Sequence, residues 1–152
     1  MSYITTTSSE HFSQKELSCP CCGVIYYDSR AVHRLERLRS IMWSPITVTS
    51  GCRCHNHNKA IRGHSNSMHL TFKKNKKVGA LGFDIRIRNT NEKWRNKLIR
   101  EALALGFSIG INKSFIHLDL RILDGYRQQI FYYKGVIPSW VDADALKDIE
   151  LE

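Results

Sequence analysis

Three short stretches, Ser67-Met68-His69, Gly82-Phe83-Asp84-Ile85 and Phe115-Ile116-His117-Leu118-Asp119, decide how this chain is interpreted. They supply two imidazoles and two carboxylates on segments whose composition predicts loop or strand. A His, Asp and His set around one Zn²⁺ leaves the fourth tetrahedral position open for water, as in catalytic zinc sites. If the stretches converge in space, they predict a zinc hydrolase. If they do not, they predict a small basic protein with scattered histidines.

The polar residues of the last two stretches interrupt apolar strands. His117 and Asp119 are two positions apart, so on a strand their side chains share one face. A cross-strand ion pair would explain such a pair as well as a metal site would. Asp84 likewise stands in an apolar run, after Ala80 and Gly82, which leave room for a close neighbour.

The hydrophobic pattern predicts an α+β fold, with a small antiparallel sheet flanked by helices. We expect one helix of about 14 residues after Ser29 and another from Thr90 or Asn91 to about Leu105. Strands are expected at 46–49, 80–87, 107–111, 116–120 and 128–133, the last three antiparallel. Residues 55–68, rich in Asn, His, Ser and Gly, are expected to form an irregular loop. The acidic tail from residue 142 is expected to form a short helix.

Length and charge limit the possible partners. The 152 residues suit one domain, and the net charge of +9 favours nucleic acid, a membrane surface or an acidic cell-wall polymer. The chain carries no RNA-binding aromatic signature and no clear helix-turn-helix, so we expect no nucleic-acid partner. Residues 1–10 lack the apolar segment of a signal peptide, and no run is long enough to span a membrane. We therefore expect synthesis in the cytoplasm, no membrane insertion and a monomer.

The five cysteines form two groups: Cys19, Cys21, Cys22, then Cys52, Cys54. An odd number argues against an obligatory disulfide framework. One interpretation is a second, structural zinc held by four of them, but C-P-C-C and C-R-C are not the usual C-x₂-C knuckles. The interpretation favoured by the spacing is reduced, partly buried thiols beside turns.

Five short motifs follow one another in a familiar order: S-G-x-R at 50–53, H-N-x-A at 57–60, N-S-x-H at 66–69, G-x-D-I at 82–85 and F-I-H-x-D-x-R at 115–121. This order resembles the peptidoglycan-cleaving zinc peptidases related to D-Ala-D-Ala carboxypeptidases. That group includes small phage endolysins and shares a core fold with the hedgehog signalling domain. The resemblance covers about residues 11–133, so it implies a single zinc peptidase domain with an acidic C-terminal tail.

By position, the resemblance implies one catalytic Zn²⁺ held by His69, Asp84 and His117. It also implies that Arg53 faces a substrate carboxylate, for which a planar guanidinium is well suited. Ser67 would orient the loop or a ligand carboxylate. The implied substrate is an amide bond in a peptidoglycan stem peptide or cross-link. The implied setting is a phage or prophage endolysin that acts on the wall after release.

Two departures from the family pattern concern the site. The family spacing H-x-x-G-x-A-x-D is shorter than the distance from His69 to Asp84, and the added stretch 72–77 is rich in lysine. We interpret it as an exposed hairpin that could touch an anionic wall polymer, because extra loop length costs little. The alternative is that Asp84 is displaced and the site is lost.

The second departure concerns the general base. Related enzymes often carry an acid three residues before the last His ligand, where this chain has Ser114. Asp119 is the nearest matching acid and is the predicted catalytic residue, either as the base or by orienting His117. Ser114 motivates a rival interpretation, a non-catalytic wall-binding domain that keeps its zinc. A second rival is a nucleic-acid protein whose zinc is held by the cysteines.

Overall fold

Short strands alternate with helices along residues 3–74 and 76–151, which the computed structural model describes. The α-helices are α1 (Gln14–Leu17), α2 (Ser29–Met42), α3 (His55–Ala60), α4 (Glu92–Ala104) and α5 (Ala143–Lys147). The strands are β1 (Ile4–Thr5), β2 (Tyr27–Asp28), β3 (Val48–Ser50), β4 (Phe72–Lys73), β5 (Lys76–Lys77), β6 (Gly82–Arg86), β7 (Ser108–Ile111), β8 (Phe115–Asp119) and β9 (Ile130–Tyr132). The 3₁₀ turns η1 (Arg121–Asp124) and η2 (Tyr133–Gly135) follow β8 and β9. This mixture confirms the predicted α+β class.

The central sheet has the strand order β3-β6-β8-β7-β9. Its first four strands pair antiparallel, as predicted, but β9 runs parallel to β7. The prediction of an antiparallel strand at 128–133 is therefore wrong. Because β6 occupies the other edge of β8, β9 pairs with β7 instead; the chain reverses after β8, so β9 runs opposite to β8 and therefore parallel to β7.

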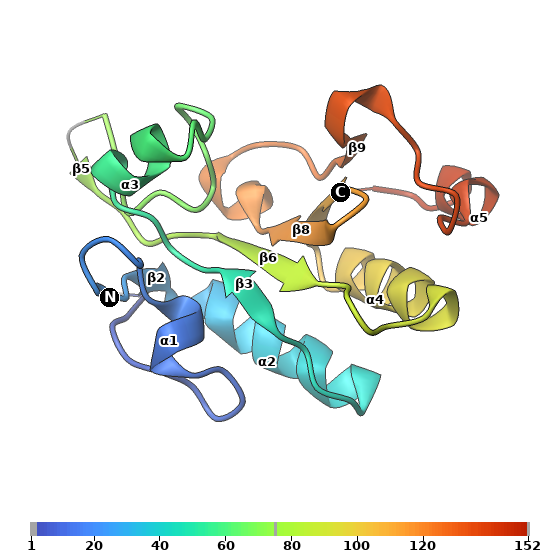
Figure 1. Cartoon of the computed structure of the whole chain (residues 1–152), viewed down its shortest axis with the longest axis horizontal. Helices are drawn as coiled ribbons and strands as arrows, with labels where there is room; N and C mark the ends of the chain where they lie inside the picture. Colours follow the sequence, from blue (N-terminus) through green and yellow to red (C-terminus); the bar gives the residue numbers. More distant parts are fainter. Residues whose placement is uncertain (1–2, 75, 152) are drawn as a thin grey trace.

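Helices α2 and α4 pack against each other, and apolar residues of the sheet complete the core. Alternation along β6 and β8 buries one row of side chains in this core: Phe83, Ile85, Ile116 and Leu118. Both helices have the predicted extents within a residue or two, and α4 begins at the predicted cap, Asn91. Helix α2 is capped by Asp28, one residue before the expected position. Figure 1 shows the two helices beside the sheet, with α3 and the β4–β5 hairpin at the opposite end of the view.

The segment predicted as an irregular loop contains helix α3. Its N-cap is Cys54, whose sulfur accepts a hydrogen bond from the backbone N–H of His57 at 3.4 Å. A helix this short has no hydrophobic period to detect, and a cysteine cap is outside the usual Ser, Thr, Asp and Asn set. The rest of the stretch is turn and bend, as expected.

The N-terminal arm is fastened to the sheet. Phe12 and Leu17 are fully buried, and α1 is closed by a capping box between Ser13 and Glu16. The same Glu16 carboxylate accepts the backbone N–H of Val48 in β3 at 2.9 Å. A side chain on Gly51 would collide with the Leu17 carbonyl oxygen, so only glycine allows this close approach.

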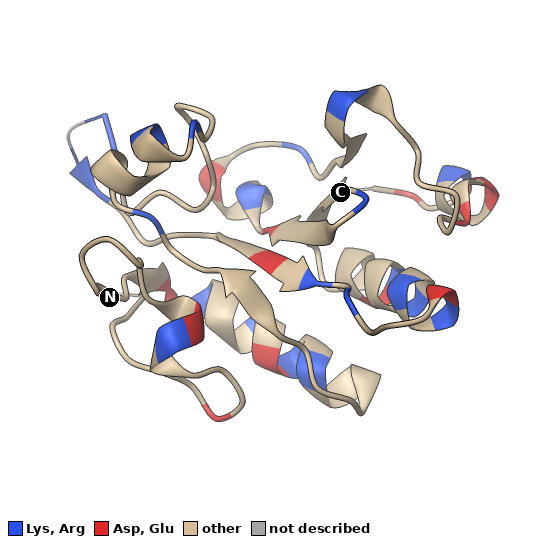
Figure 2. Ribbon diagram, viewed as in Figure 1, with Lys and Arg blue, Asp and Glu red and all other residues tan. Residues whose placement is uncertain are grey.

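Basic side chains mark the hairpin predicted between His69 and Asp84. Strands β4 and β5 pair antiparallel, which confirms the hairpin, and Figure 2 shows Lys and Arg gathered on it. Among the described residues, none of the helices is both long enough and apolar enough to cross a membrane.

Candidate metal centre

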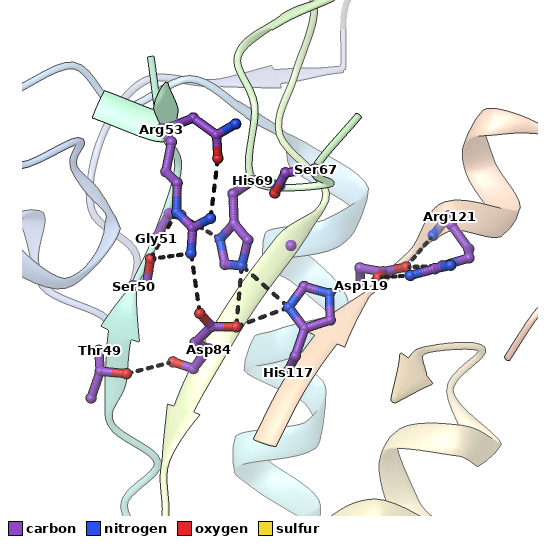
Figure 3. A network of polar contacts seen from close by, with 12 residues as sticks. Thr49, Ser50, Gly51, Arg53, Ser67, His69, Asp84, His117, Asp119 and Arg121 are labelled. Carbon is purple, nitrogen blue, oxygen red and sulfur yellow. Dashed lines mark hydrogen bonds and ion pairs between the residues drawn. The ribbon is translucent and has the colours of Figure 1, made fainter. Parts of the chain in front are cut away.

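Three elements bring the predicted ligands together. Asp84 in β6 lies directly opposite His117 in β8, so the two side chains leave the same face of the sheet. His69 comes from the loop before β4, and Figure 3 shows its ring directed at Asp84 and His117. All three residues are buried.

The three potential ligand atoms converge closely. His69 Nε2 lies 3.1 Å from Asp84 Oδ1 and 3.2 Å from His117 Nδ1, and His117 Nδ1 lies 2.8 Å from the same Asp84 oxygen. A tetrahedral ion with bonds of about 2.0–2.1 Å has edges of roughly 3.3 Å between its ligand atoms. The observed triangle is close to that size, so the donor set fits a zinc ion.

The outer nitrogen of each imidazole is fixed by an acceptor. His69 Nδ1 lies 2.7 Å from the Gly51 carbonyl oxygen, and His117 Nε2 lies 2.7 Å from Asp119 Oδ2. Since a carbonyl and a carboxylate can only accept, each outer nitrogen carries the proton and donates. In the neutral form, each imidazole held this way presents the lone pair of its inner nitrogen to the metal position, which is the usual arrangement around zinc-bound histidines.

Asp119 is held away from the open side of the site. Arg121 donates to both of its carboxylate oxygens, at 2.9 Å from Nε and 2.7 Å from Nη2, and its own backbone N–H adds a third hydrogen bond. The Asp119 side chain is fully buried. Of the two roles left open for Asp119, these contacts favour orienting His117 over acting as the base.

The electrostatics keep the carboxylates charged. Burial raises the pKa of Asp84, but His69 and His117 outweigh burial and hold that pKa well below its usual range. Burial lowers the pKa of His69. Burial also opposes the charged form of His117, yet its hydrogen bonds to Asp119 and Asp84 raise its pKa to about 9. A strong anion thus sits between two imidazoles, as a cation site requires.

Arg53 and Ser67 lie at the edge of the triad. The Arg53 guanidinium donates to Asp84 Oδ2 at 3.3 Å, to Ser50 Oγ and to Asn58 Oδ1. The Ser67 hydroxyl accepts the backbone N–H of His69 at 3.2 Å and so fixes the turn that carries this ligand. Both residues line the cavity described next.

A cavity of about 720 Å³ opens onto the inner side of the triad. One wall is aromatic, with Phe115, Tyr126, Phe131 and Tyr133. The other walls carry the cations Arg53, Arg62 and Arg121 with the polar residues His64, Asn66 and Ser67. Its size is that of a ligand site, and its charge suits an anionic ligand.

The added hairpin does not displace Asp84. The backbone of Gly82 lets the loop pass directly over β6, because a Cβ there would meet the Met68 backbone at 3.1 Å and the His69 nitrogen at 3.2 Å. This is the space that Ala80 and Gly82 were predicted to leave. Asp84 therefore keeps its place beside His69 and His117, contrary to the displacement in the alternative interpretation.

Some contributors to the site escape prediction. The Gly51 carbonyl that orients His69 belongs to the main chain and leaves no side-chain signal. Phe131 and Tyr133 reach the cavity only because β9 pairs beside β7, where Gly110 leaves space for their rings. Arg121 stands in the F-I-H-x-D-x-R motif, whose final position could have indicated its pairing with Asp119.

The fold and the site define a candidate metal centre of the kind found in zinc hydrolases. The family model for Peptidase M15 matches residues 10–119, and the chain therefore belongs to the Peptidase M15 family of zinc metallopeptidases. This match contains all three predicted ligands as well as Arg53 and Ser67. Comparisons with curated proteins and with solved structures give no match.

Proposed function

We propose that the chain hydrolyses an amide bond in the stem peptide or cross-link of peptidoglycan, as an endolysin of a phage or prophage. The observation that carries the proposal is the open triad: three ligand atoms converge and face a cavity rich in arginine. Three protein ligands with one free position are the mark of catalytic rather than structural zinc.

The chain's own residues would prepare the reaction. When bound, Zn²⁺ would act as a Lewis acid on the scissile carbonyl and lower the pKa of water toward about 7. His69 and His117 are held in the ligating tautomer by the Gly51 carbonyl and by Asp119. Because these contacts exist in the folded chain already, little reorganisation is needed at the moment of reaction.

Arg53 gives the site its preference for a peptide acid. Its side chain is only 12% exposed, and Ser50, Asn58 and Asp84 hold the guanidinium at the cavity wall. A guanidinium held this way loses little freedom on binding, and the N–H of Nη1 that these partners leave free can meet a substrate carboxylate. Stem peptides end in carboxylates, so the cation is placed for such a substrate.

The same cavity supports a second candidate, a wall-binding domain that holds zinc without hydrolysis. Among the described residues that line the cavity, Asp84 is the only carboxylate, and it is one of the proposed ligands. Asp119 is engaged by Arg121 and His117, and Ser114 cannot act as a carboxylate base. A general base would then have to come from another group.

Incubation of the zinc-loaded protein with purified peptidoglycan distinguishes the two candidates. Hydrolysis releases new amino groups, whereas a binding domain only sediments with the sacculi. His117→Ala is the negative control, because it removes a proposed ligand. If zinc is bound and sacculi are bound but no amino groups appear, the enzyme proposal fails and the binding domain stands.

The basic surface supports the choice of an anionic polymer as partner. Lys74, Lys76 and Lys77 on the β4–β5 hairpin are exposed, and the whole chain carries a charge of +9. Attraction between exposed charges falls with ionic strength, so binding to the wall should weaken as salt is added. In the proposed setting the protein reaches the wall after release from the cytoplasm, and it works there as a monomer.

A further inference from the structure

A second group of metal-binding side chains lies outside the triad. The sulfur atoms of Cys19, Cys22 and Cys54 all lie within 4.8 Å of one another. Cys19 and Cys22 belong to the N-terminal arm, whereas Cys54 caps helix α3. We propose that these thiols, with Cys21, hold a second zinc ion that is structural and separate from the triad.

The geometry fits zinc bound by sulfur. Tetrahedral zinc with Zn–S bonds of about 2.3 Å has sulfur atoms roughly 3.8 Å apart. Cys19 and Cys22 are separated by two residues, so the C-P-C-C stretch does contain a C-x₂-C pair. The spacing of Cys19 and Cys22 is therefore suitable for zinc, contrary to the expectation from the sequence, in which Cys21 lies between them. The second half of the site comes from the other group of cysteines through Cys54.

Cys21 is the candidate for the fourth ligand. Its exposed thiol is next in sequence to Cys22 but is not among the three sulfur atoms that lie within 4.8 Å of one another, so its side chain would turn toward them to complete the set. Four thiols from one arm and one helix cap would give a closed site without a position for water. Closed sites of this type are structural, in contrast to the open triad.

The backbone favours thiolate at Cys19, the most deeply buried of the four thiols. The N–H of Cys54 points at its sulfur at 3.4 Å. Backbone N–H groups directed at sulfur stabilise the charged form that zinc requires.

Cys52 does not belong to this cluster. Its buried thiol donates to the carbonyl oxygens of Leu17 and Val24, at 3.3 and 3.1 Å. It packs the arm against the sheet as a small hydrophobic residue would. Cys52 is therefore a matched control for substitutions of the four clustered thiols.

The proposed site would staple the arm to the segment that carries Arg53. Arg53 lies between Cys52 and Cys54, and its backbone N–H donates to the His69 carbonyl at 2.7 Å. Fixing Cys54 therefore fixes one end of the strand-like stretch beside the triad. The second zinc would contribute stability and position, not chemistry.

Zinc content of the purified, reduced chain tests the proposal. We expect about two zinc ions per chain for the unaltered protein and for Cys52→Ser, and about one for Cys22→Ser and for His117→Ala. Substitution with Co²⁺ gives a second readout. Thiolate-to-cobalt charge transfer should appear in His117→Ala and be lost or strongly reduced in Cys22→Ser.

Two results would overturn the second site. One is a single zinc that disappears in His117→Ala and persists in Cys22→Ser with its stoichiometry unchanged. The other is a disulfide among Cys19, Cys21, Cys22 and Cys54 in the protein isolated without reductant, with no zinc bound there after reduction. Neither result bears on hydrolysis at the triad, so the two proposals fail separately.

Discussion

The triad and the cysteine cluster use different parts of the fold to gather potential ligands. The triad stands on two paired strands and one clamped loop, and all three of its residues are buried. The cluster joins a turn of the arm to a helix cap, and Cys21 and Cys22 are exposed. Paired strands fix a few ligands precisely while one side stays open to a cavity. An ion that joins two loops mainly holds them together. A zinc ion at the triad would therefore take part in catalysis, whereas one at the cysteine cluster would stabilise the fold.

Removing a triad ligand should have the largest effect on activity, and it should distinguish the triad from the cysteine cluster most clearly. In His117→Ala we expect loss of the triad zinc and a fall in hydrolysis of about 10³-fold or more, because Lewis-acid stabilisation contributes several kcal/mol. Peptidoglycan hydrolysis and zinc content are the measurements. His33→Ala, on the exposed face of α2, is the control. Full activity in His117→Ala would break the assignment of the triad.

Replacing Arg53 tests whether the open side of the triad reads a carboxylate. The substitution Arg53→Lys keeps the positive charge at this position but removes the planar guanidinium and its fixed N–H donors. We expect KM to rise roughly 10- to 150-fold, equal to about 1.5–3 kcal/mol for a charged hydrogen bond, with a smaller change in kcat. Steady-state kinetics on a stem peptide measure the effect, and zinc content should stay unchanged. An unaltered KM would remove Arg53 from substrate recognition.

The substitution Asp119→Asn tests how strongly zinc binding at the triad depends on the carboxylate that accepts the hydrogen bond from His117. The substitution removes a charge that fixes the His117 tautomer, so we expect zinc affinity to fall by about 10- to 100-fold at the triad alone. Competition with a chelator measures it. Asp124→Asn, which alters an exposed pair with Lys73, should leave affinity unchanged. If excess zinc does not restore activity in Asp119→Asn, the base role gains support instead.

The smallest effect should come from a change that touches neither region. Asn91 caps α4 by accepting the backbone N–H of Trp94 at 2.8 Å. Asn91→Ala should lower the free energy of unfolding by about 1 kcal/mol, with zinc content and activity unchanged. Denaturant unfolding measures it, and Lys93→Ala is the neighbouring control. Loss of zinc in Asn91→Ala would mean that the metal regions report general stability rather than local ligation.

Much of the fold could be predicted because long helices carry their own signals. The apolar period of α2 and α4 and the cap at Asn91 are local, so the sequence reveals them. The direction of β9 is not local, since it depends on which strand edge is free after β6 pairs with β8. Helix α3 is too short for a period, and its cap is a cysteine.

The ligands of the site could be predicted because they are side chains of characteristic type in recognisable motifs. His69, Asp84 and His117 were predicted from motif order, and the structure brings their ligand atoms together. What could not be predicted is the support: the Gly51 carbonyl, and the part of the aromatic wall supplied by Tyr126, Phe131 and Tyr133. The link from Cys19 and Cys22 to Cys54 spans more than 30 positions and exists only once the arm packs on the sheet.

The β4–β5 hairpin is closed at its base before it leaves the molecule. Thr71 donates to the Arg53 carbonyl, Val78 donates to the Thr71 carbonyl, and Leu81 donates to the Met68 carbonyl. The part of the hairpin beyond these three hydrogen bonds can change in length or charge while His69 and Asp84 keep their positions. The hairpin is thus a position where a peptide of different length and charge could be grafted without moving His69 or Asp84.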